Sequence, residues 1–283
     1  MMEIKKIAVL GSGVMGRGVA HVTAMGGFET TLYDISESQL ERATNEIRIN
    51  MEKGVKRELY SKEVKDLALS NLNRTINFEE AVSDADFVIE AVPEDIKLKC
   101  EIFQKLDEIC KSHVILATNT STMSPTEIGG VTKRPDRVIA MHFFNPVFKM
   151  KLVEIIRGLE TSDETYQTTE KVAKQMGKET VMVNEAPGFV TSRVSALVGN
   201  EAFRMLEEGV ASPVDIDKAI KLGLNYPMGP LELGDLVGLD TRLKILNYLH
   251  ETLGDRYRPS PLMIKYVKAG RLGRKVGKGV YDY

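Results

Sequence analysis

The stretch that decides the fold is residues 4–34, IKKIAVLGSGVMGRGVAHVTAMGGFETTLYD. It begins with a short apolar run, Ile4 to Leu10, which is typical of a buried strand. A glycine-rich turn follows at 11–16, and a helix is predicted to run from it to about Gly26. Phe28 to Tyr33 is then predicted to be a second strand. A strand, a helix and a strand in this order predict a right-handed parallel crossover.

The turn of this unit is Gly11-Ser12-Gly13-Val14-Met15-Gly16, which matches G-x-G-x-x-G. The motif has meaning here because it follows a strand and opens a helix. Gly11 permits the tight turn, Gly13 lets the backbone approach a pyrophosphate, and Gly16 lets helix and strand pack closely. The helix N-terminus adds free N–H groups for the phosphates. We therefore expect a dinucleotide to bind at this turn, including at Val14 and Met15.

Alternation of strands and helices continues along the chain. A charged helical stretch is predicted from Ser36 to about Ser70. Further strands are predicted at Asp86–Ala91, His113–Ala117 and Arg137–His142, with a last candidate at Val181–Val183. This order predicts an α/β fold with a doubly wound sheet of the Rossmann type.

The pattern changes near residue 186. Beyond it β-rich runs disappear, and Ser192–Glu208 and Val214–Leu222 have apolar residues at helical spacing. We therefore predict two domains, a nucleotide-binding Rossmann-type domain at 1–185 and an all-α domain at 186–283.

Bulk properties narrow the function. A chain of 283 residues accommodates two domains, and a net charge of −2 gives no reason to expect nucleic acid or an anionic membrane as partner. No apolar run approaches the ~20 residues of a spanning helix, and we expect no secretory signal at the N-terminus. Cys100 and Cys110 fit neither a disulfide framework nor a metal site. We interpret them as reduced packing residues of a cytoplasmic protein.

Asp34 ends the second strand of the first unit. A carboxylate there can accept hydrogen bonds from both adenosine ribose hydroxyls and would repel the extra phosphate of NADP, so we expect NAD. The alternative is that Asp34 caps the next helix, although Ser36 is also placed to do so.

His142 is the candidate acid/base among four histidines. It ends a predicted strand, and ligands of a doubly wound sheet bind beyond the carboxyl ends of the strands. Glu154 lies in the run KLVEII at 151–156, which can return as a strand after Pro146. Such a carboxylate would fix the imidazole tautomer. His21, His113 and His250 are expected to be structural or exposed.

Several segments together resemble the L-3-hydroxyacyl-CoA dehydrogenase family. They are GSGVMG at 11–16, ATNTST at 117–122, MHFFNPVFKMKLVEI at 141–155, APGFVTSR at 186–193, PMGPLELGDLVGLD at 227–240 and the tail GRLGRKVGKGVYDY. The resemblance covers essentially the whole chain. Its length resembles the stand-alone bacterial members that act on 3-hydroxybutyryl-CoA, not the long multifunctional enzymes.

The resemblance implies roles for individual residues. His142 matches the catalytic histidine, Glu154 its carboxylate partner and Ser121 the serine that hydrogen-bonds the substrate's 3-oxygen. The remaining candidates are Ala91, Glu94, Lys99 and Asn119 for the cofactor and Asn145 for the substrate.

The resemblance also implies that basic residues bind the phosphates of CoA and that the protein is a dimer. Lys53 and Lys56 are the candidates for holding the CoA phosphates, although one expected lysine position holds Ile49. By the same resemblance the helical domain closes over the substrate and carries a homodimer interface. The chain departs from the usual G-F-x-V-N-R at Ser192, where the family has an asparagine that contacts the substrate or the histidine pair.

Two other functions stay open at this stage. A sister NAD-dependent dehydrogenase of a free hydroxy acid would use the same histidine–glutamate pair, and CoA affinity would separate the two. A non-catalytic NAD-binding protein is the other alternative, and retention of Ser121, His142 and Glu154 together argues against it.

Overall fold

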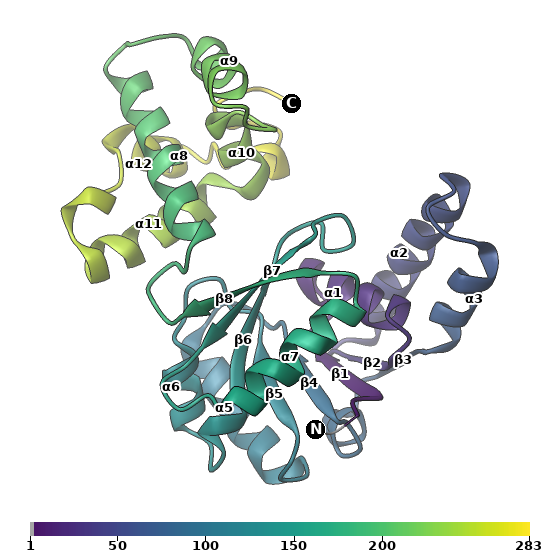
Figure 1. Cartoon of the computed structure of the whole chain (residues 1–283). Coiled ribbons are helices and arrows are strands. Elements are labelled where there is room, and N and C mark those ends of the chain that lie inside the picture. The colour runs from purple at the N-terminus through teal and green to yellow at the C-terminus, as the bar shows by residue number, and fades with distance from the viewer. Residues whose placement is uncertain (1–2) are drawn as a thin grey trace. The chain divides into compact units, whose positions relative to one another are not determined.

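The computed structural model describes residues 3–283. The chain forms two compact units, one ending at Glu185 and the other spanning Ala186–Tyr283. The first contains the sheet with its helices, and the second is helical (Figure 1). Within the described residues, no helix has both the length and the apolar character needed to cross a membrane.

The first unit is built on one eight-stranded sheet with the order β3-β2-β1-β4-β5-β6-β7-β8. Neighbouring strands run parallel except β6 and β7, which run antiparallel. The strands are β1 (Lys6–Leu10), β2 (Glu29–Tyr33), β3 (Leu72–Thr75), β4 (Phe87–Glu90), β5 (Ile115–Thr118), β6 (Val138–Phe143), β7 (Leu152–Arg157) and β8 (Glu179–Asn184). The order runs outward from β1 in both directions, which confirms the predicted doubly wound arrangement.

Helices cover both faces of this sheet (Figure 1). One face packs on α1 (Val14–Met25), α2 (Glu37–Lys56), α3 (Lys62–Ser70) and α7 (Asp163–Gln175). The other packs on α4 (Phe78–Val82), α5 (Ile96–Ile109) and α6 (Pro125–Gly130), and a 3₁₀ turn at Pro135–Arg137 leads into β6. Because both faces are covered, the central strands are apolar on both sides.

The region after β2 differs from the prediction of one helical stretch. The chain turns between α2 and α3, where Glu58 has a φ of 57° and Ser61 caps α3 by accepting from the Val64 N–H. β3, which follows α3, was not predicted. Its sequence LNRT is half-buried at most, because it is the edge strand and has a neighbour on one side only. Such a strand lacks the apolar run that identifies an inner one.

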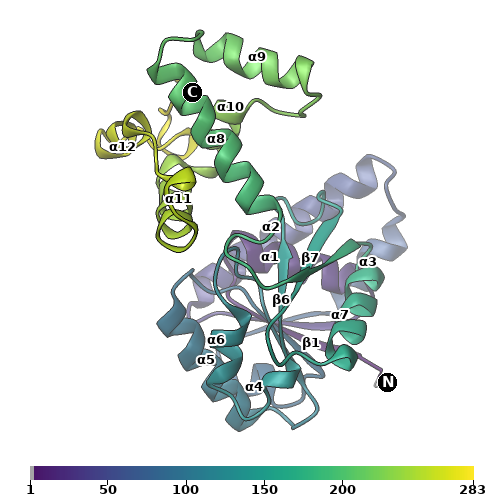
Figure 2. The ribbon, with the colours of Figure 1, turned by 60° about the vertical axis from the view of Figure 1, so that its left-hand side comes forward.

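The second unit packs its helices around α8 (Thr191–Glu207), which contacts α9 (Pro213–Gly223), α10 (Pro230–Val237), α11 (Leu239–Leu253) and α12 (Pro261–Lys268) (Figure 2). Short 3₁₀ turns lie at Asp255–Tyr257 and Arg274–Val276. Phe203, Leu231 and Leu246 are among its buried core residues.

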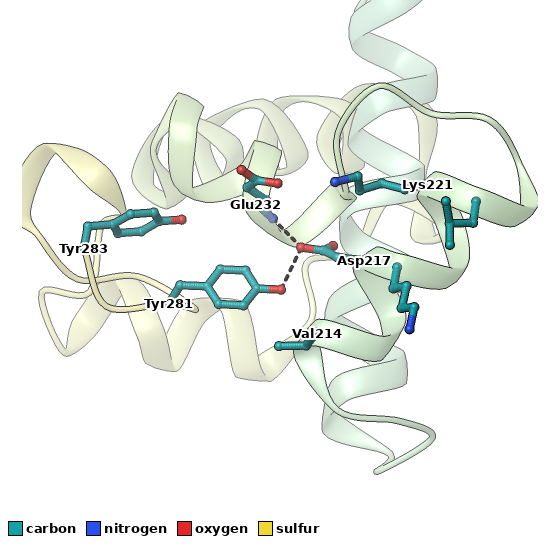
Figure 3. A pocket seen from close by; sticks show the side chains of 8 residues that line it. Val214, Asp217, Lys221, Glu232, Tyr281 and Tyr283 are labelled. Carbon is teal, nitrogen blue, oxygen red and sulfur yellow. Dashed lines mark hydrogen bonds between the residues drawn. The ribbon is translucent and has the colours of Figure 1, made fainter.

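Two buried carboxylates attach the C-terminal tail to this unit. Asp217 accepts from the N–H groups that open α10 and from the Tyr281 hydroxyl at 2.7 Å, beside a surface hollow (Figure 3). Asp235 accepts from the N–H groups of Val280 and Tyr281. A Cβ on Gly279 would lie 2.1 Å from Asp235. We interpret this cluster as structural, because its polar groups satisfy one another.

Candidate functional site

The chemistry-bearing residues of the first unit gather at one edge of the sheet. β1, β4, β5 and β6 are parallel neighbours, so their carboxyl ends meet there. Backbone hydrogen bonds join the loops that follow: the Ala91 N–H donates to Leu10 O at 2.8 Å, and the Asn119 N–H donates to Glu90 O at 2.7 Å. The glycine turn, the 119–122 loop and the end of β6 are thereby held on one framework.

The glycine turn has the shape that a pyrophosphate requires. Gly11 has a φ of +95°, and a Cβ on it would lie 2.8 Å from Ala91 O. A Cβ on Gly16 would lie 1.7 Å from Gly11 O, so helix and turn pack too closely for any side chain. A Cβ on Gly13 would meet nothing within 4 Å. Gly13 is also the N-cap of α1, and no side chain caps it, so the helix N–H groups remain available for an anion.

Asp34 is fixed beside this turn. Its Oδ2 accepts from the Ser12 N–H at 2.8 Å and from the Ser12 hydroxyl at 2.7 Å, and its Oδ1 accepts from the Ser36 N–H at 3.1 Å. Ser36 itself caps α2 by accepting from the Gln39 N–H. The side chain that caps the helix is therefore Ser36 and not Asp34. Ser12 and Ser36 hold the carboxylate of Asp34 in a fixed orientation.

A cavity of about 750 Å³ connects these residues. Six of the predicted cofactor residues line it, namely Gly11, Gly13, Val14, Met15, Asp34 and Ala91. Its other walls are largely apolar, with Phe78, Leu98 and Ile102 among them. A hydrophobic slot that ends in a carboxylate and a bare helix terminus fits an adenosine diphosphate moiety, so the residues present suit NAD.

His142 and Glu154 are direct cross-strand neighbours in the register of β6 and β7. The His142 Nδ1 lies 2.7 Å from the Glu154 Oε2. Glu154 is fully buried and His142 is 7% exposed, and the Phe144 ring lies 4.5 Å from the imidazole. The carboxylate contact at Nδ1 fixes the orientation of the imidazole ring.

Ser121 is held by Glu94. The Glu94 Oε1 accepts from the Ser121 N–H at 2.9 Å, from the Ser121 hydroxyl at 3.4 Å and from the Thr120 hydroxyl at 2.5 Å. The Glu94 Oε2 lies 3.3 Å from the Lys99 Nζ. Predicted cofactor and substrate residues thus form one polar cluster.

Lys99 is more deeply placed than a simple cofactor contact would be. Its side chain is 1% exposed, and its Nζ donates to both oxygens of Glu90 at 2.7 and 2.9 Å. Glu90 is fully buried and also accepts from the Thr118 hydroxyl at 2.6 Å. The sequence analysis did not identify Glu90, because a glutamate ending an apolar strand gives no sign of which helix residue will meet it.

Asn119 connects this cluster to the histidine strand. Its Oδ1 accepts from the Phe143 N–H at 3.0 Å, one residue beyond His142. Asn145 is exposed and lies before a cis peptide bond to Pro146, in the turn that leads towards β7. The structure thus brings Asn119 next to the acid/base strand and leaves Asn145 at the surface.

A second concavity in the first unit is basic. We call it the basic hollow; its volume is about 570 Å³, and its lining includes His21, Asn50, Lys53, Arg57, Tyr60, Phe148, Lys149 and Lys178. Lys53 lines it as one of the predicted CoA residues, whereas Lys56 is not among the lining residues. Arg57, which the sequence analysis missed, does line it. Arg57 follows the last residue of α2, where helical spacing no longer predicts direction.

Ser192 belongs to the helical unit. It lies in the first turn of α8, after Gly188 with a φ of 72° and Phe189 with a φ of 49°. Its side chain is partly buried.

Comparison with known proteins identifies the family. Residues 6–186 match the model of the 3-hydroxyacyl-CoA dehydrogenase NAD binding domain, and residues 188–283 match that of the C-terminal domain. A Bacillus subtilis protein named as a probable 3-hydroxybutyryl-CoA dehydrogenase is 50% identical, over 100% of this chain and 98% of its own. The 3-hydroxybutyryl-CoA dehydrogenase of Clostridioides difficile is 46% identical, over 98% of this chain and 99% of its own.

A solved structure agrees with these relatives. The crystal structure of (S)-3-hydroxybutyryl-CoA dehydrogenase from Ralstonia eutropha has a TM-score of 0.95 and 42% identity, with 99% of both chains covered. The chain therefore belongs to the 3-hydroxyacyl-CoA dehydrogenase family.

Proposed function

We propose that this chain is an NAD-dependent dehydrogenase that interconverts (3S)-3-hydroxybutyryl-CoA and acetoacetyl-CoA. The observation that carries the proposal is the His142–Glu154 pair, 2.7 Å apart, on the sheet edge that also holds the dinucleotide turn. Family membership supports the CoA thioester, and the relatives named for 3-hydroxybutyryl-CoA support the short acyl chain.

His142 moves the proton. In oxidation, its Nε2 takes the proton of the 3-hydroxyl, and in reduction the imidazolium returns it to the 3-oxygen. NAD, when bound at the glycine turn, would supply the group that exchanges a hydride with C3 of the substrate. Glu154, held in the next strand, fixes the tautomer with Nε2 directed to the substrate and stabilises the imidazolium that forms.

Ser121 positions the reacting oxygen. Its hydroxyl can donate to the 3-oxygen while the Ser121 N–H stays bound to Glu94 at 2.9 Å. Glu94 is in turn held by Lys99. An oxygen fixed in this way lies in line for proton transfer before the reaction starts, which lowers the entropic part of the barrier.

The basic hollow is proposed to hold the phosphates of CoA. Lys53, Arg57, Lys149 and Lys178 all line it. Lys178 is 7% exposed and donates to Met150 O at 2.9 Å, so it orders the 147–150 segment as well as adding charge. Lys56 is outside the lining, and we assign it at most a long-range electrostatic role.

The alternative substrate is a free hydroxy acid. A free hydroxy acid needs one cationic partner close to the histidine. Several cations in a separate concavity can instead bind the phosphate groups of CoA. The basic hollow therefore favours the CoA ester over a sister dehydrogenase of a free hydroxy acid.

The protein is further proposed to be a homodimer through its helical unit and to act in the cytoplasm. Exposed apolar residues of that unit, such as Val214, Leu222 and Leu224, support the first proposal. The free thiols of Cys100 and Cys110 agree with the second.

The test is His142→Gln, assayed by NADH absorbance with acetoacetyl-CoA and with free acetoacetate. We expect wild-type turnover with the CoA ester alone, and a loss of kcat of ~10²–10⁴-fold in the variant with NADH affinity retained. His113→Gln is the matched control and should keep full activity. Retention of half the turnover by His142→Gln would remove this residue from the mechanism, and failure of the wild type in a single turnover would favour a non-catalytic NAD-binding protein.

A further inference from the structure

Arg242, on α11 of the helical unit, is a buried charge that the mechanism does not use. It is 9% exposed, and its Nη1 donates to the Ser195 hydroxyl at 2.8 Å. Among residues 3–283 this hydroxyl is the one side-chain partner of the guanidinium, and it is neutral. A guanidinium has five N–H donors, so most of its hydrogen-bonding capacity is not used by the protein.

A buried cation without a counterion is costly, and proteins normally pair such a charge. Burial lowers the pKa of Arg242 to about 10, which reflects that cost and leaves the group charged at neutral pH. In the described residues, every side-chain nitrogen or oxygen that is shielded from solvent has a hydrogen-bond partner. The spare N–H groups of Arg242 must therefore face open space.

That space is a hollow of about 380 Å³ open to the surface of the helical unit, near the lower end of small-ligand sites, which span roughly 300–1,000 Å³. Its wall is mainly apolar, with Val190, Val194, Val198 and Leu233, and Arg242 is its single lysine or arginine. None of the residues assigned above to proton transfer, cofactor or CoA lines it.

We propose that this hollow binds a small monocarboxylate with a short apolar chain, a site additional to the hydride-transfer site. A planar carboxylate matches the guanidinium in a bidentate pair, and one cation balances one negative charge, which disfavours a phosphate dianion. The Ser195 hydroxyl accepts from Arg242 and keeps its own hydrogen for the same ligand. The apolar wall then contacts the chain of the acid.

Titration calorimetry of the full-length protein with sodium butyrate, at constant ionic strength, tests the proposal. We expect saturable binding of butyrate, several-fold weaker binding of acetate because it has less apolar chain, and none of the neutral butyramide. Arg242→Gln should weaken butyrate binding at least tenfold. Arg256→Gln, which changes an exposed arginine of the same unit, should leave it unchanged.

Ser195→Asp provides a test that does not depend on losing the arginine. It places a carboxylate within reach of Arg242, so it should raise the Tm and abolish butyrate binding. Equal heats for butyrate and chloride, or unchanged butyrate binding in Arg242→Gln, would overturn the proposal. So would a shift of Arg242→Gln to a smaller species in sedimentation without any butyrate effect, because Arg242 would then pair with a carboxylate of a second copy.

Discussion

Lys99→Met tests whether the buried ion pair beneath the 119–122 loop holds the site together. Methionine keeps much of the length of lysine and removes its charge. In the native protein the Nζ lies 2.7 and 2.9 Å from the two oxygens of Glu90, which is fully buried. The variant leaves this carboxylate with the Thr118 hydroxyl and the Val92 N–H as donors, at 2.6 and 2.7 Å.

The expected loss of stability follows from that geometry. Removing one partner of a buried pair typically costs about 3–5 kcal/mol, because the other charge stays buried. Since two donors still serve Glu90, we expect the lower end, about 3 kcal/mol, in the free energy of unfolding by urea. Glu90→Gln combined with Lys99→Met removes both charges and should recover about 2 kcal/mol of this loss.

Activity should respond as well. Without Lys99, Glu94 loses the cation 3.3 Å away and holds the Ser121 N–H less firmly. We expect kcat to fall about tenfold, equivalent to ~1.4 kcal/mol. Lys111→Met is the matched control: its pair with Asp84, at 2.9 Å, is exposed on both sides and should contribute little to stability. If Lys99→Met loses no more stability than Lys111→Met, or the double variant recovers none, the pair does not hold the site.

Three further results are expected. Asp34→Ala should reduce the preference for NADH over NADPH in kcat/KM by about tenfold, and a wild type that prefers NADPH would contradict the cofactor assignment. Burial lowers the pKa of His21 from 6.5 to about 4, so between these pH values the unfolded chain binds a proton that the folded protein does not, and stability falls as the pH drops. His21→Phe should remove ~3 kcal/mol of this loss of stability. If the Tm of the variant falls with acid as steeply as that of the wild type, His21 does not cause the loss. Ser192→Asn should change kcat/KM by less than about tenfold, because a water can bridge the shorter serine, whereas a hundredfold gain would mean that the natural serine impairs the enzyme.

The parts of the site that could be predicted are those that depend on strand alternation. His142 ends one strand, and Glu154 alternates with Val153 and Ile155 in the next, so pairing of the two strands alone brings the side chains together. The glycine turn was predictable for a similar reason, since its geometry is local. Their assignment as functional residues remains a prediction until the variants are measured.

The parts that could not be predicted depend on how a helix is rotated against the sheet or on where a helix ends. Glu90 meets Lys99 because α5 directs that lysine at the end of β4, and one lysine among several in a charged helix gives no sign of this. Arg57 enters the basic hollow from the residue after α2. The apolar spacing of α11 predicts a helix, but its charged Arg242 lies on the buried side.

Two fully buried glutamates on the same sheet have different partners, and the difference separates their roles. Lys99 and Glu90 are 1% and 0% exposed and also contact Glu94 and Thr118, so this pair holds the neighbouring loop in position. The His142–Glu154 pair, 2.7 Å apart, is the one proposed to move the proton of the reaction. β4 and α5 carry the first pair and β6 with β7 the second, and Asn119 links them by donating to Glu90 O and accepting from the Phe143 N–H. In the proposed mechanism the first pair steadies the loop that orients the substrate oxygen, and the second pair acts on that oxygen. Substitutions in the first pair should consequently lower stability and kcat together, whereas substitutions in the second should lower kcat with a smaller effect on folding.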